Sequence, residues 1–265
     1  MDEAIAASGP TAEEALVAVG RIGKAETLEQ AWGLICDLMG RWGFDRVNYG
    51  LTRFRVGDNI GSPEDILYLT SLPPDRARVY FDTGFFARTA IFRWLSDNVG
   101  AISWRWALEE QAAGRLNPQE EEAQRQLAKW GGWVGYSIAF PETSQRSKGA
   151  MGLHARPGLG QDDVDALWAE QGEMIEAACL AAHMKLSQMP VPGAKLTPRQ
   201  REILEWIADG KSLQDVCVLT DLSLSAVDKH LRRVRDYLGV ETTAQAVAKV
   251  SFLNQIFVRP VPGRR

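Results

Sequence analysis

The sequence predicts an α+β protein in two parts: an N-terminal α-β-α sandwich around an antiparallel sheet, and a C-terminal all-α domain of four helices. Strand-like segments occur only in the N-terminal region, with helical patterns before, between and after them. Residues 196–265 hold four short helical patterns and no strand pattern. Between the two regions, the segment SQMPVPGAK places two prolines and a glycine where helical periodicity stops.

This segment, residues 187–195, is the expected linker between domains at 1–186 and 196–265. Charge divides at nearly the same place. Residues 195–265 carry 12 Lys and Arg against 8 Asp and Glu, a net charge of +4, whereas the rest of the chain carries −8. An acidic chain taken whole argues against nucleic acid as a partner, but a separate basic domain restores that class of partner.

The elements of the N-terminal region follow from the spacing of apolar residues. Helices are expected at about 12–22 and 27–41, then strands at about 46–54 and 65–70. Further elements are helices at about 74–83, 89–97 and 118–130, strands at 134–140 and 149–155, and a long helix at about 161–186. Eight of the nine tryptophans lie in this region. Aromatic side chains at this density either fill a core or line an apolar pocket with a few polar groups.

The four C-terminal helices carry almost every expected start and stop signal. Three of them begin with an N-cap whose capping-box partner follows three residues later: Thr197 with Gln200, Ser212 with Asp215, and Thr242 with Gln245. Pro198 suits the first helical position, where its missing N–H costs nothing. Ser223 can cap the third helix, and Gly210 and Gly239 stand where positive φ commonly ends a helix.

The third of these helices is expected to have one apolar and one basic side. Its apolar stripe, at steps of three and four residues, comprises Leu224, Val227, Leu231, Val234 and Leu238. The other side carries Ser225, Ala226, Lys229, Arg232 and Arg233, with Arg235 near the edge. A short helix of this kind, following another after a tight turn, is typical of a helix-turn-helix. A solvated basic helix in a four-helix bundle is the competing interpretation.

The segment resembles the C-terminal domain of LuxR-type transcription regulators, and this resemblance favours the helix-turn-helix. The matching positions are Leu196, Thr197, Pro198, Arg199, Glu202, Leu204, Trp206, Gly210, Lys211, Ser212, Val227, His230, Leu231, Leu238, Gly239, Ala246, Val247 and Ala248. Gln200 replaces the family's usual Glu, and either side chain can complete a capping box. Thr243 or Ala244 stands where the family often has Arg, which removes one expected phosphate contact.

The resemblance implies a cytoplasmic homodimer that binds double-stranded DNA at a roughly palindromic operator, with RNA polymerase as a candidate partner. We expect Lys229, Arg232 and Arg233 to contact the major groove and phosphates, and Ser225, Ala226 and Asp228 to shape base choice. Two helical stripes are expected to form the dimer contact. One is Val164, Trp168, Gln171, Ile175, Ala178 and Ala182 in the long helix; the other is Val247, Val250, Ser251 and Asn254 in the last helix.

A weaker resemblance to the family's autoinducer-binding domain covers the N-terminal region. In the family an aromatic ladder, an Asp and a later Trp hold an acyl-homoserine lactone. Tyr80 matches the second Tyr of the ladder, Trp104 matches the later Trp, and Gly131 with Gly135 match a glycine motif before a strand. The positions that depart from the family are Leu72 for the first Tyr, Arg76 for the ladder Trp, Thr89 for the Asp, Ala90 for a Pro, and Ala139 for a strand Pro.

These departures make an ordinary acyl-homoserine lactone a poor fit. The resemblance implies Arg76, Tyr80, Thr89 and Trp104 as ligand-binding positions, but Thr89 is a weaker acceptor than a carboxylate. Arg76 supplies a fork of donors that suits a carboxylate or phosphate. It therefore meets an anionic or strongly accepting ligand, pairs with an internal carboxylate, or turns outward while the pocket shrinks. Alternatively, the N-terminal domain binds no small molecule and serves dimerisation or a partner protein.

Other classes of function have little support in the sequence. A G-x-S-x-G motif, a Walker loop and a clustered set of His, Cys and carboxylates are all missing, so we expect neither an enzyme nor a cofactor. The cysteines and histidines lack metal-ligand spacing: Cys36, Cys179, Cys217, His154, His183 and His230. The first residues, MDEAIAASGP, are acidic and lack an apolar run, so neither a secretory leader nor a membrane span is expected.

Overall fold

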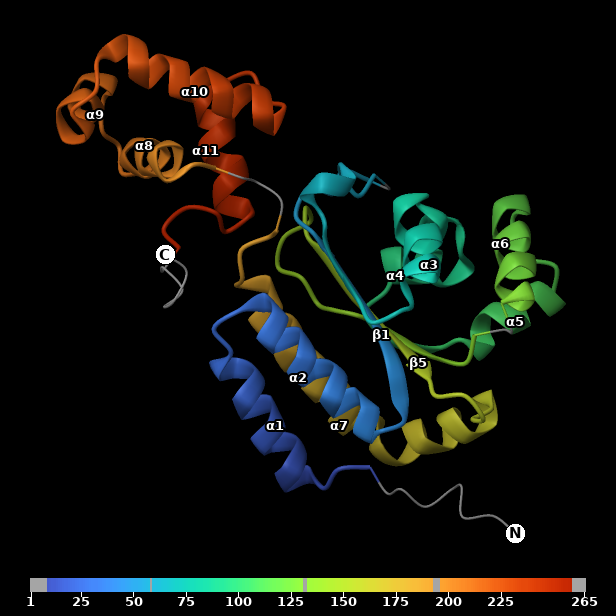
Figure 1. Ribbon diagram of the computed structural model, residues 1–265. Coiled ribbons are helices and arrows are strands. Elements are labelled where there is room, and N and C mark those ends of the chain that lie inside the picture. Colours follow the sequence, from blue (N-terminus) through green and yellow to red (C-terminus); the bar gives the residue numbers. More distant parts are fainter. Residues whose placement is uncertain (1–8, 58, 131–132, 193–195, 259–265) are drawn as a thin grey trace. The chain divides into compact units, whose positions relative to one another are not determined.

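The computed structural model describes residues 9–57, 59–130, 133–192 and 196–258 (Figure 1). The chain divides into two compact units, Met1–Ser187 and Gln188–Arg265. Residues 193–195 of the segment expected as a linker lie outside the described residues. Within the described part, no helix combines the length and apolarity that crossing a bilayer requires.

An antiparallel sheet of five strands forms the centre of the first unit, in the order β2-β1-β5-β4-β3. The strands are β1 (Phe44–Thr52), β2 (Leu67–Thr70), β3 (Gly100–Ser103), β4 (Gly135–Ala139) and β5 (Lys148–Ala155). The expected α-β-α sandwich around an antiparallel sheet is confirmed. Strand β3 was not expected, because four residues at a sheet edge are too short to show the alternation that marks a strand.

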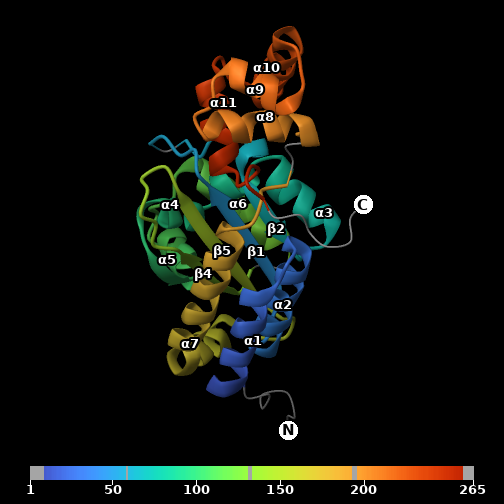
Figure 2. The same cartoon turned by 90° about the vertical axis from the view of Figure 1, so that its left-hand side faces the viewer.

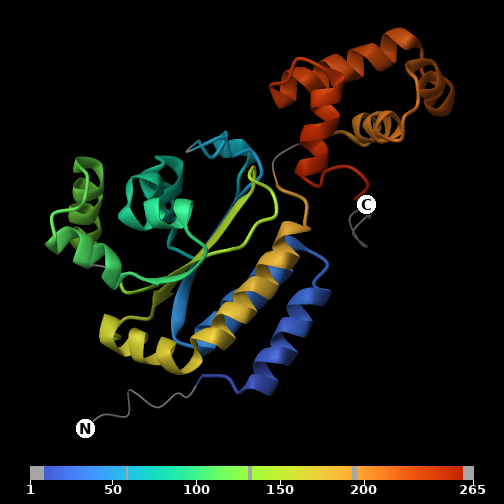
Figure 3. The same ribbon diagram turned by 180° about the vertical axis from the view of Figure 1, so that it is seen from behind.

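One face of the sheet packs against α2 (Leu28–Arg41) and α7 (Gln161–Ser187), and α1 (Ala12–Lys24) packs on these two helices; the three lie together in Figure 3. Capping by Thr11 and Thr27 begins α1 and α2. The strands present large side chains to these helices: the Tyr136 ring stacks on Trp168 of α7 at 3.9 Å, and Tyr49 contacts His183. This layer holds most of the large, fully buried side chains of the unit.

The opposite face of the sheet is covered by α3 (Pro74–Ala77), α4 (Ala90–Asp97), α5 (Arg105–Ala112) and α6 (Pro118–Lys129) (Figure 1). The helix expected at 74–83 is a single α-turn followed by a π-helical turn at Arg78–Asp82. Short 3-10 turns occur at Pro63–Asp65 and Phe85–Arg88. Helix α5 was also unexpected; it begins without a side-chain cap, so its start signal is missing.

The expected dimer stripe on the long helix is wrong. Val164, Ile175, Ala178 and Ala182 are buried inside the first unit. Helix α7 packs on the sheet and on both α1 and α2, so it is covered on more than one side and its apolar positions do not form a single exposed seam. Its exposed large apolar side chains are Leu180 and Met184.

The second unit is all-α, as expected (orange and red in Figure 2). Its helices are α8 (Pro198–Ala208), α9 (Leu213–Thr220), α10 (Leu224–Leu238) and α11 (Thr243–Phe252). All three expected capping boxes form, and Ser223 caps α10. The stripe of α10 enters the core, with one exception: Leu224, the first residue of the helix, is 51% exposed.

Candidate functional site

A cavity of about 460 Å³ lies in the first unit, between the sheet and the helical layer of α4, α5 and α6. Small residues on this face of the sheet leave the space open. Ala150 of β5 lies beside Gly50 of β1, and Gly152 lies between Asn48 and Ser137 on the two neighbouring strands. Because successive side chains of a strand point to opposite faces, the same strands present large residues to the core and small residues to the cavity.

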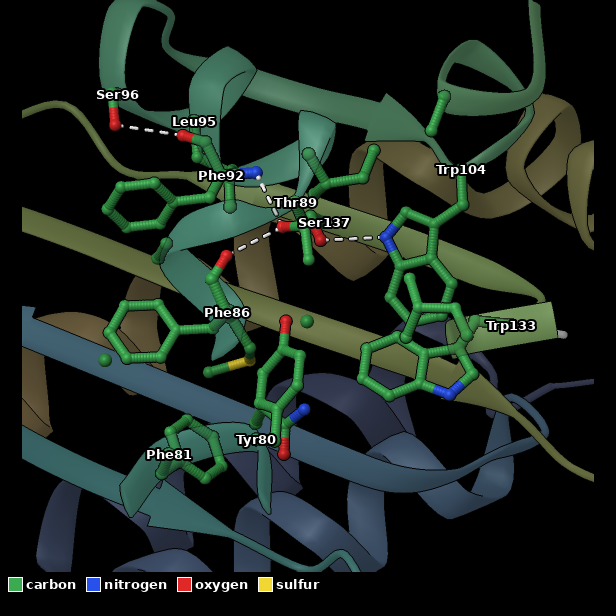
Figure 4. Close-up of a pocket in the computed structure, with 18 of the residues that line it drawn as sticks. Tyr80, Phe81, Phe86, Thr89, Phe92, Leu95, Ser96, Trp104, Trp133 and Ser137 are labelled. Carbon is green, nitrogen blue, oxygen red and sulfur yellow. Dashed lines mark hydrogen bonds between the residues drawn. The ribbon is translucent and has the colours of Figure 1, made fainter. Parts of the chain in front are cut away.

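Aromatic rings form the helical wall of the cavity (Figure 4). They belong to Tyr80, Phe81, Phe86, Phe92, Trp104 and Trp133. Tyr80 lies in the π-helical turn, where its ring centroid is 4.9 Å from that of Trp133. Burial raises the pKa of the Tyr80 hydroxyl, so this group is a neutral donor and acceptor at physiological pH. The indole N–H of Trp104 donates to Ser137 Oγ at 2.8 Å.

Thr89 lines the cavity and is the N-cap of α4. Its Oγ1 accepts from the Phe92 N–H at 3.2 Å and donates to the Phe86 carbonyl at 2.8 Å. A hydroxyl has one donor and two lone pairs, so one acceptor site remains for a ligand. No Asp or Glu occurs among the described residues that line the cavity. The described lining therefore offers a ligand N–H no charged acceptor.

A buried chain of polar side chains enters the cavity from the sheet. The Thr70 hydroxyl donates to Asn48 Oδ1 at 2.6 Å, which turns Asn48 Nδ2 toward His154 Nε2 at 2.8 Å. His154 Nε2 is then the acceptor and the ring proton lies on Nδ1, which has no hydrogen-bond partner among the described residues. The imidazole ring packs edge-on against Trp104 and Trp133, at 4.6 and 4.5 Å between centroids.

His154 is neutral at physiological pH. Burial, with a smaller contribution from the charges of Arg46 and Arg76, lowers its pKa to about 3. An uncharged ring can donate from Nδ1–H to a ligand oxygen without bringing a net charge into the apolar part of the cavity. His154 is therefore a candidate for holding a carbonyl or hydroxyl group.

Of the four ligand positions expected from the sequence, the structure brings Tyr80, Thr89 and Trp104 together in the lining of the cavity. Arg76 is half-buried and is not among the lining residues. It forms no ion pair with a carboxylate of the described residues, so the outward position is the outcome that remains. The pocket has not closed with it, because the cavity of about 460 Å³ is within the range of small-molecule sites. The positive charge of Arg76 still affects the site, because it contributes to the lowered pKa of His154.

Three lining residues were not among the positions expected from the sequence: Asn48, Trp133 and His154. Asn48 and His154 are polar residues inside strands, and each has a glycine two residues away on the same face, Gly50 and Gly152, which is a usable signal. Of the glycine motif, Gly131 lies outside the described residues, but the need for Gly135 is evident. A Cβ at Gly135, where φ is +155°, would lie 2.0 Å from the Leu153 carbonyl oxygen.

A basic surface occurs on α10 of the second unit. Ser225, Asp228, Lys229, Arg232 and Arg233 are exposed, and Ala226 is half-buried. The two arginines and Lys229 form no ion pair within the described residues. Helix α9 ends at Thr220, and its C-cap Asp221, with a φ of 53°, makes the tight turn before Ser223 caps α10. The geometry is that of a helix-turn-helix whose second helix has an unneutralised basic side.

A helix-turn-helix unit joined to an α-β-α unit with an internal cavity defines a two-domain class of DNA-binding transcription regulator. Family comparison agrees. The family described as "Autoinducer binding domain" matches residues 27–186, and "Bacterial regulatory proteins, luxR family" matches residues 194–250. The chain belongs to the luxR family of bacterial regulatory proteins, which are transcription regulators rather than enzymes.

Individual relatives cover most of the chain at low identity. Transcriptional activator protein SolR of Ralstonia solanacearum is 25% identical over 234 residues, 85% of this chain and 91% of SolR. The HTH-type quorum sensing-dependent transcriptional regulator RpaR of Rhodopseudomonas palustris is 26% identical over 202 residues, 75% of this chain and 78% of RpaR. A crystal structure of Escherichia coli SdiA is 15% identical, covers 92% of this chain and 98% of that chain, and has a TM-score of 0.46.

Proposed function

We propose that this protein is a ligand-responsive transcription regulator whose signal is a small molecule bound in the cavity of the first unit. The observation that carries the proposal is the cavity itself. Protein interiors are close-packed, and a cavity of about 460 Å³ forfeits contacts that a ligand would restore. A domain that served only dimerisation or partner binding would gain by filling this space with larger side chains at Gly50, Ala150 and Gly152.

The ligand contacts proposed are Tyr80, Thr89 and Trp104, joined by Trp133 and His154. An ordinary acyl-homoserine lactone fits them poorly because its amide N–H needs a strong acceptor. The cavity has no carboxylate among its described lining residues, and the one acceptor site left on the Thr89 hydroxyl is uncharged. A charge-assisted hydrogen bond contributes about 1.5–3 kcal/mol, so its absence weakens binding roughly ten- to a hundredfold.

The DNA-binding surface proposed is the basic side of α10. Lys229, Arg232 and Arg233 are exposed and form no ion pair within the described residues, so each can contact a phosphate or a base edge. Ser225, Ala226 and Asp228 lie toward the N-terminal end of the same helix, the part that reaches base edges when such a helix enters the major groove.

The working form proposed is a cytoplasmic homodimer on a roughly palindromic operator. One helix-turn-helix unit reads too few base pairs for selectivity, so two half-sites about one DNA turn apart are needed. Exposed apolar side chains on α1 and α7 are the proposed contact in the first unit: Leu16, Val17, Leu180 and Met184. In the second unit the half-buried Val247 and the exposed Ser251 of α11 are the proposed contact, since Val250 is buried in the core.

Thermal unfolding with a ligand panel tests the sensing proposal. The panel contains acyl-homoserine lactones of several chain lengths and apolar molecules of similar size that lack an amide N–H. A ligand at 100 times its dissociation constant stabilises the fold by about 2.7 kcal/mol, which shifts the melting temperature measurably. We expect shifts from the second group and little from the lactones. A large shift from a simple acyl-homoserine lactone would contradict the proposed ligand class.

A further inference from the structure

Two cationic side chains, Arg55 and Lys148, lie together at one end of the cavity. Arg55 follows β1 and its backbone N–H donates to the Arg146 carbonyl at 2.9 Å, two residues before Lys148 begins β5. Both side chains reach the C-terminal end of α4: Arg55 Nη1 donates to the Ser96 carbonyl at 2.9 Å, and Lys148 Nζ donates to the Asn98 carbonyl at 2.7 Å. In Figure 4 this end, marked by Ser96, lies away from Trp104 and Trp133.

Most of the donor capacity of these two groups is unused. Arg55 makes one further bond, from Nε to the Gly57 carbonyl at 2.8 Å, and neither cation forms an ion pair within the described residues. A guanidinium has five N–H donors and an ammonium three, so several on each group remain for a ligand or water. Both side chains are half-buried, which makes the unpaired charge more costly than it would be in bulk water.

The electrostatics of Lys148 report the same excess of positive charge. Burial and the neighbouring Arg55 lower its pKa, although Asp97 and Glu142 act in the opposite direction from positions where they do not pair with it. The third cation of the lining, Arg125, is different, because it pairs with Glu122 at 2.8 Å and Glu121 at 3.7 Å. Among the described lining residues, Arg55 and Lys148 are therefore the cations without an ion pair, in a cavity whose described lining has no acid.

We propose that the signal molecule carries a carboxylate that binds between Arg55 and Lys148, with an apolar body lying along the aromatic wall toward Trp104. A carboxylate can accept from both cations at once through charge-assisted hydrogen bonds, and its charge offsets theirs. A neutral ester or lactone at the same place leaves the two positive charges unmatched. This inference rests on the proposed sensing function and adds the chemical class of the ligand.

The test compares straight-chain carboxylates of six to twelve carbons with their methyl esters, which keep the apolar chain and remove the charge. Isothermal titration calorimetry at pH 7.5 on the full-length protein measures both series. We expect at least one carboxylate to bind ten times or more tightly than its own ester. Equal affinity, or tighter binding of the ester, overturns the inference while leaving a small-molecule sensor in place. Binding by neither series, together with no bound molecule in protein from its own host, overturns the sensing function as well.

Substitutions locate the carboxylate. Arg55→Met and Lys148→Met should each remove most of the preference for acid over ester while leaving ester affinity unchanged, and Arg125→Met should retain the preference because that arginine is already paired. The melting temperature of each unliganded variant shows whether it folds. If a methionine variant does not fold, the ratio of carboxylate affinity to ester affinity in the unaltered protein still tests whether the ligand carries a carboxylate. A preference that survives in the folded Arg55→Met, Lys148→Met double variant overturns the proposed site.

Discussion

At the scale of single residues, position in the fold decides which polar groups can serve a ligand. Tyr80, Thr89 and Trp104 could be located from the spacing of a family motif, and all three line the cavity. The place of Arg76 outside the cavity could not be predicted in this way, because the wide π-helical turn after α3 breaks the four-residue repeat that brings side chains onto one helical face. His154 was missed because a lone histidine in a strand is most often an ordinary buried residue, and only the sheet register places it in the cavity.

The lowered pKa of His154 predicts an acid-side loss of stability. The unfolded chain takes up a proton near pH 6.5, but the folded protein does so only at about pH 3. The contribution of His154 to the free energy of unfolding is therefore fully present above pH 6.5 and is lost as the pH drops toward 3. At pH 5 the loss from this group is about 2 kcal/mol. Urea unfolding followed by tryptophan fluorescence should show a smaller loss between pH 7.5 and 5 for His154→Phe. An identical loss in His154→Phe and the unaltered protein would contradict this origin, and His230→Phe in the second unit is the control.

The basic side of α10 predicts a second residue-scale result. Arg232→Ala should weaken specific DNA binding by about 1–3 kcal/mol if the side chain contacts a base. Alanine at Lys229 or Arg233 should reduce the salt dependence of binding by about one counterion if that residue holds a phosphate. Titration of operator DNA at several salt concentrations measures both effects. Arg125→Ala, an exposed arginine of the first unit, is the control, and unchanged binding in all three folded α10 variants would refute the assignment.

At the scale of elements, caps and strand register explain most of the structure. The three capping boxes of the second unit could be predicted because both partners are local in sequence. Strand β3 and helix α5 could not be, since a four-residue edge strand and a helix without a side-chain cap depend on contacts made across the sheet. The exposure of Leu224 has the same origin. Periodicity places it on the apolar stripe, but the buried part of the stripe begins one turn later, at Val227.

Glycines in the paired strands β4 and β5 give a prediction at this scale. Gly135→Ala should cost more than about 3 kcal/mol, because its Cβ would meet the Leu153 carbonyl oxygen at 2.0 Å in a backbone conformation that favours glycine. Gly152→Ala is the matched control, since its nearest neighbours would lie 3.8 Å away. Chemical denaturation, followed on the first unit, compares the free energies of unfolding of the two variants. Similar costs for both substitutions would show that the close approach of Gly135 to β5 is not what requires glycine.

At the scale of the whole molecule, the protein combines a domain that holds a cavity with a domain that carries an exposed basic helix. The two-part α+β organisation was predictable because helical and strand periodicities are segregated along the chain. The surface proposed for a second copy was not predictable, since the periodicity of α7 does not distinguish a stripe that packs on the sheet from one that faces solvent. The sheet, α1 and α2 cover the other sides of that helix and leave Leu180 and Met184 exposed.

Dimerisation is testable on this surface. Leu180→Asp and Met184→Asp should shift the protein toward monomer and weaken operator binding by at least tenfold, because each places a charge in an apolar contact. Light scattering with and without operator DNA reads the oligomeric state. Val99→Asp alters an exposed apolar residue that lies outside α1 and α7, and should leave the dimer intact. A protein that is monomeric on a single half-site before any substitution would contradict the proposal.

Native mass spectrometry of protein purified from its own host tests whether the cavity of the first unit holds a small-molecule signal. We expect a discrete additional mass of a few hundred daltons, a size that a cavity of about 460 Å³ can hold. The same mass should be missing from an Ala150→Phe variant, whose added ring occupies the space beside Gly50. Unliganded protein under all growth conditions, or an added mass that survives the filling of the cavity, would contradict the claim.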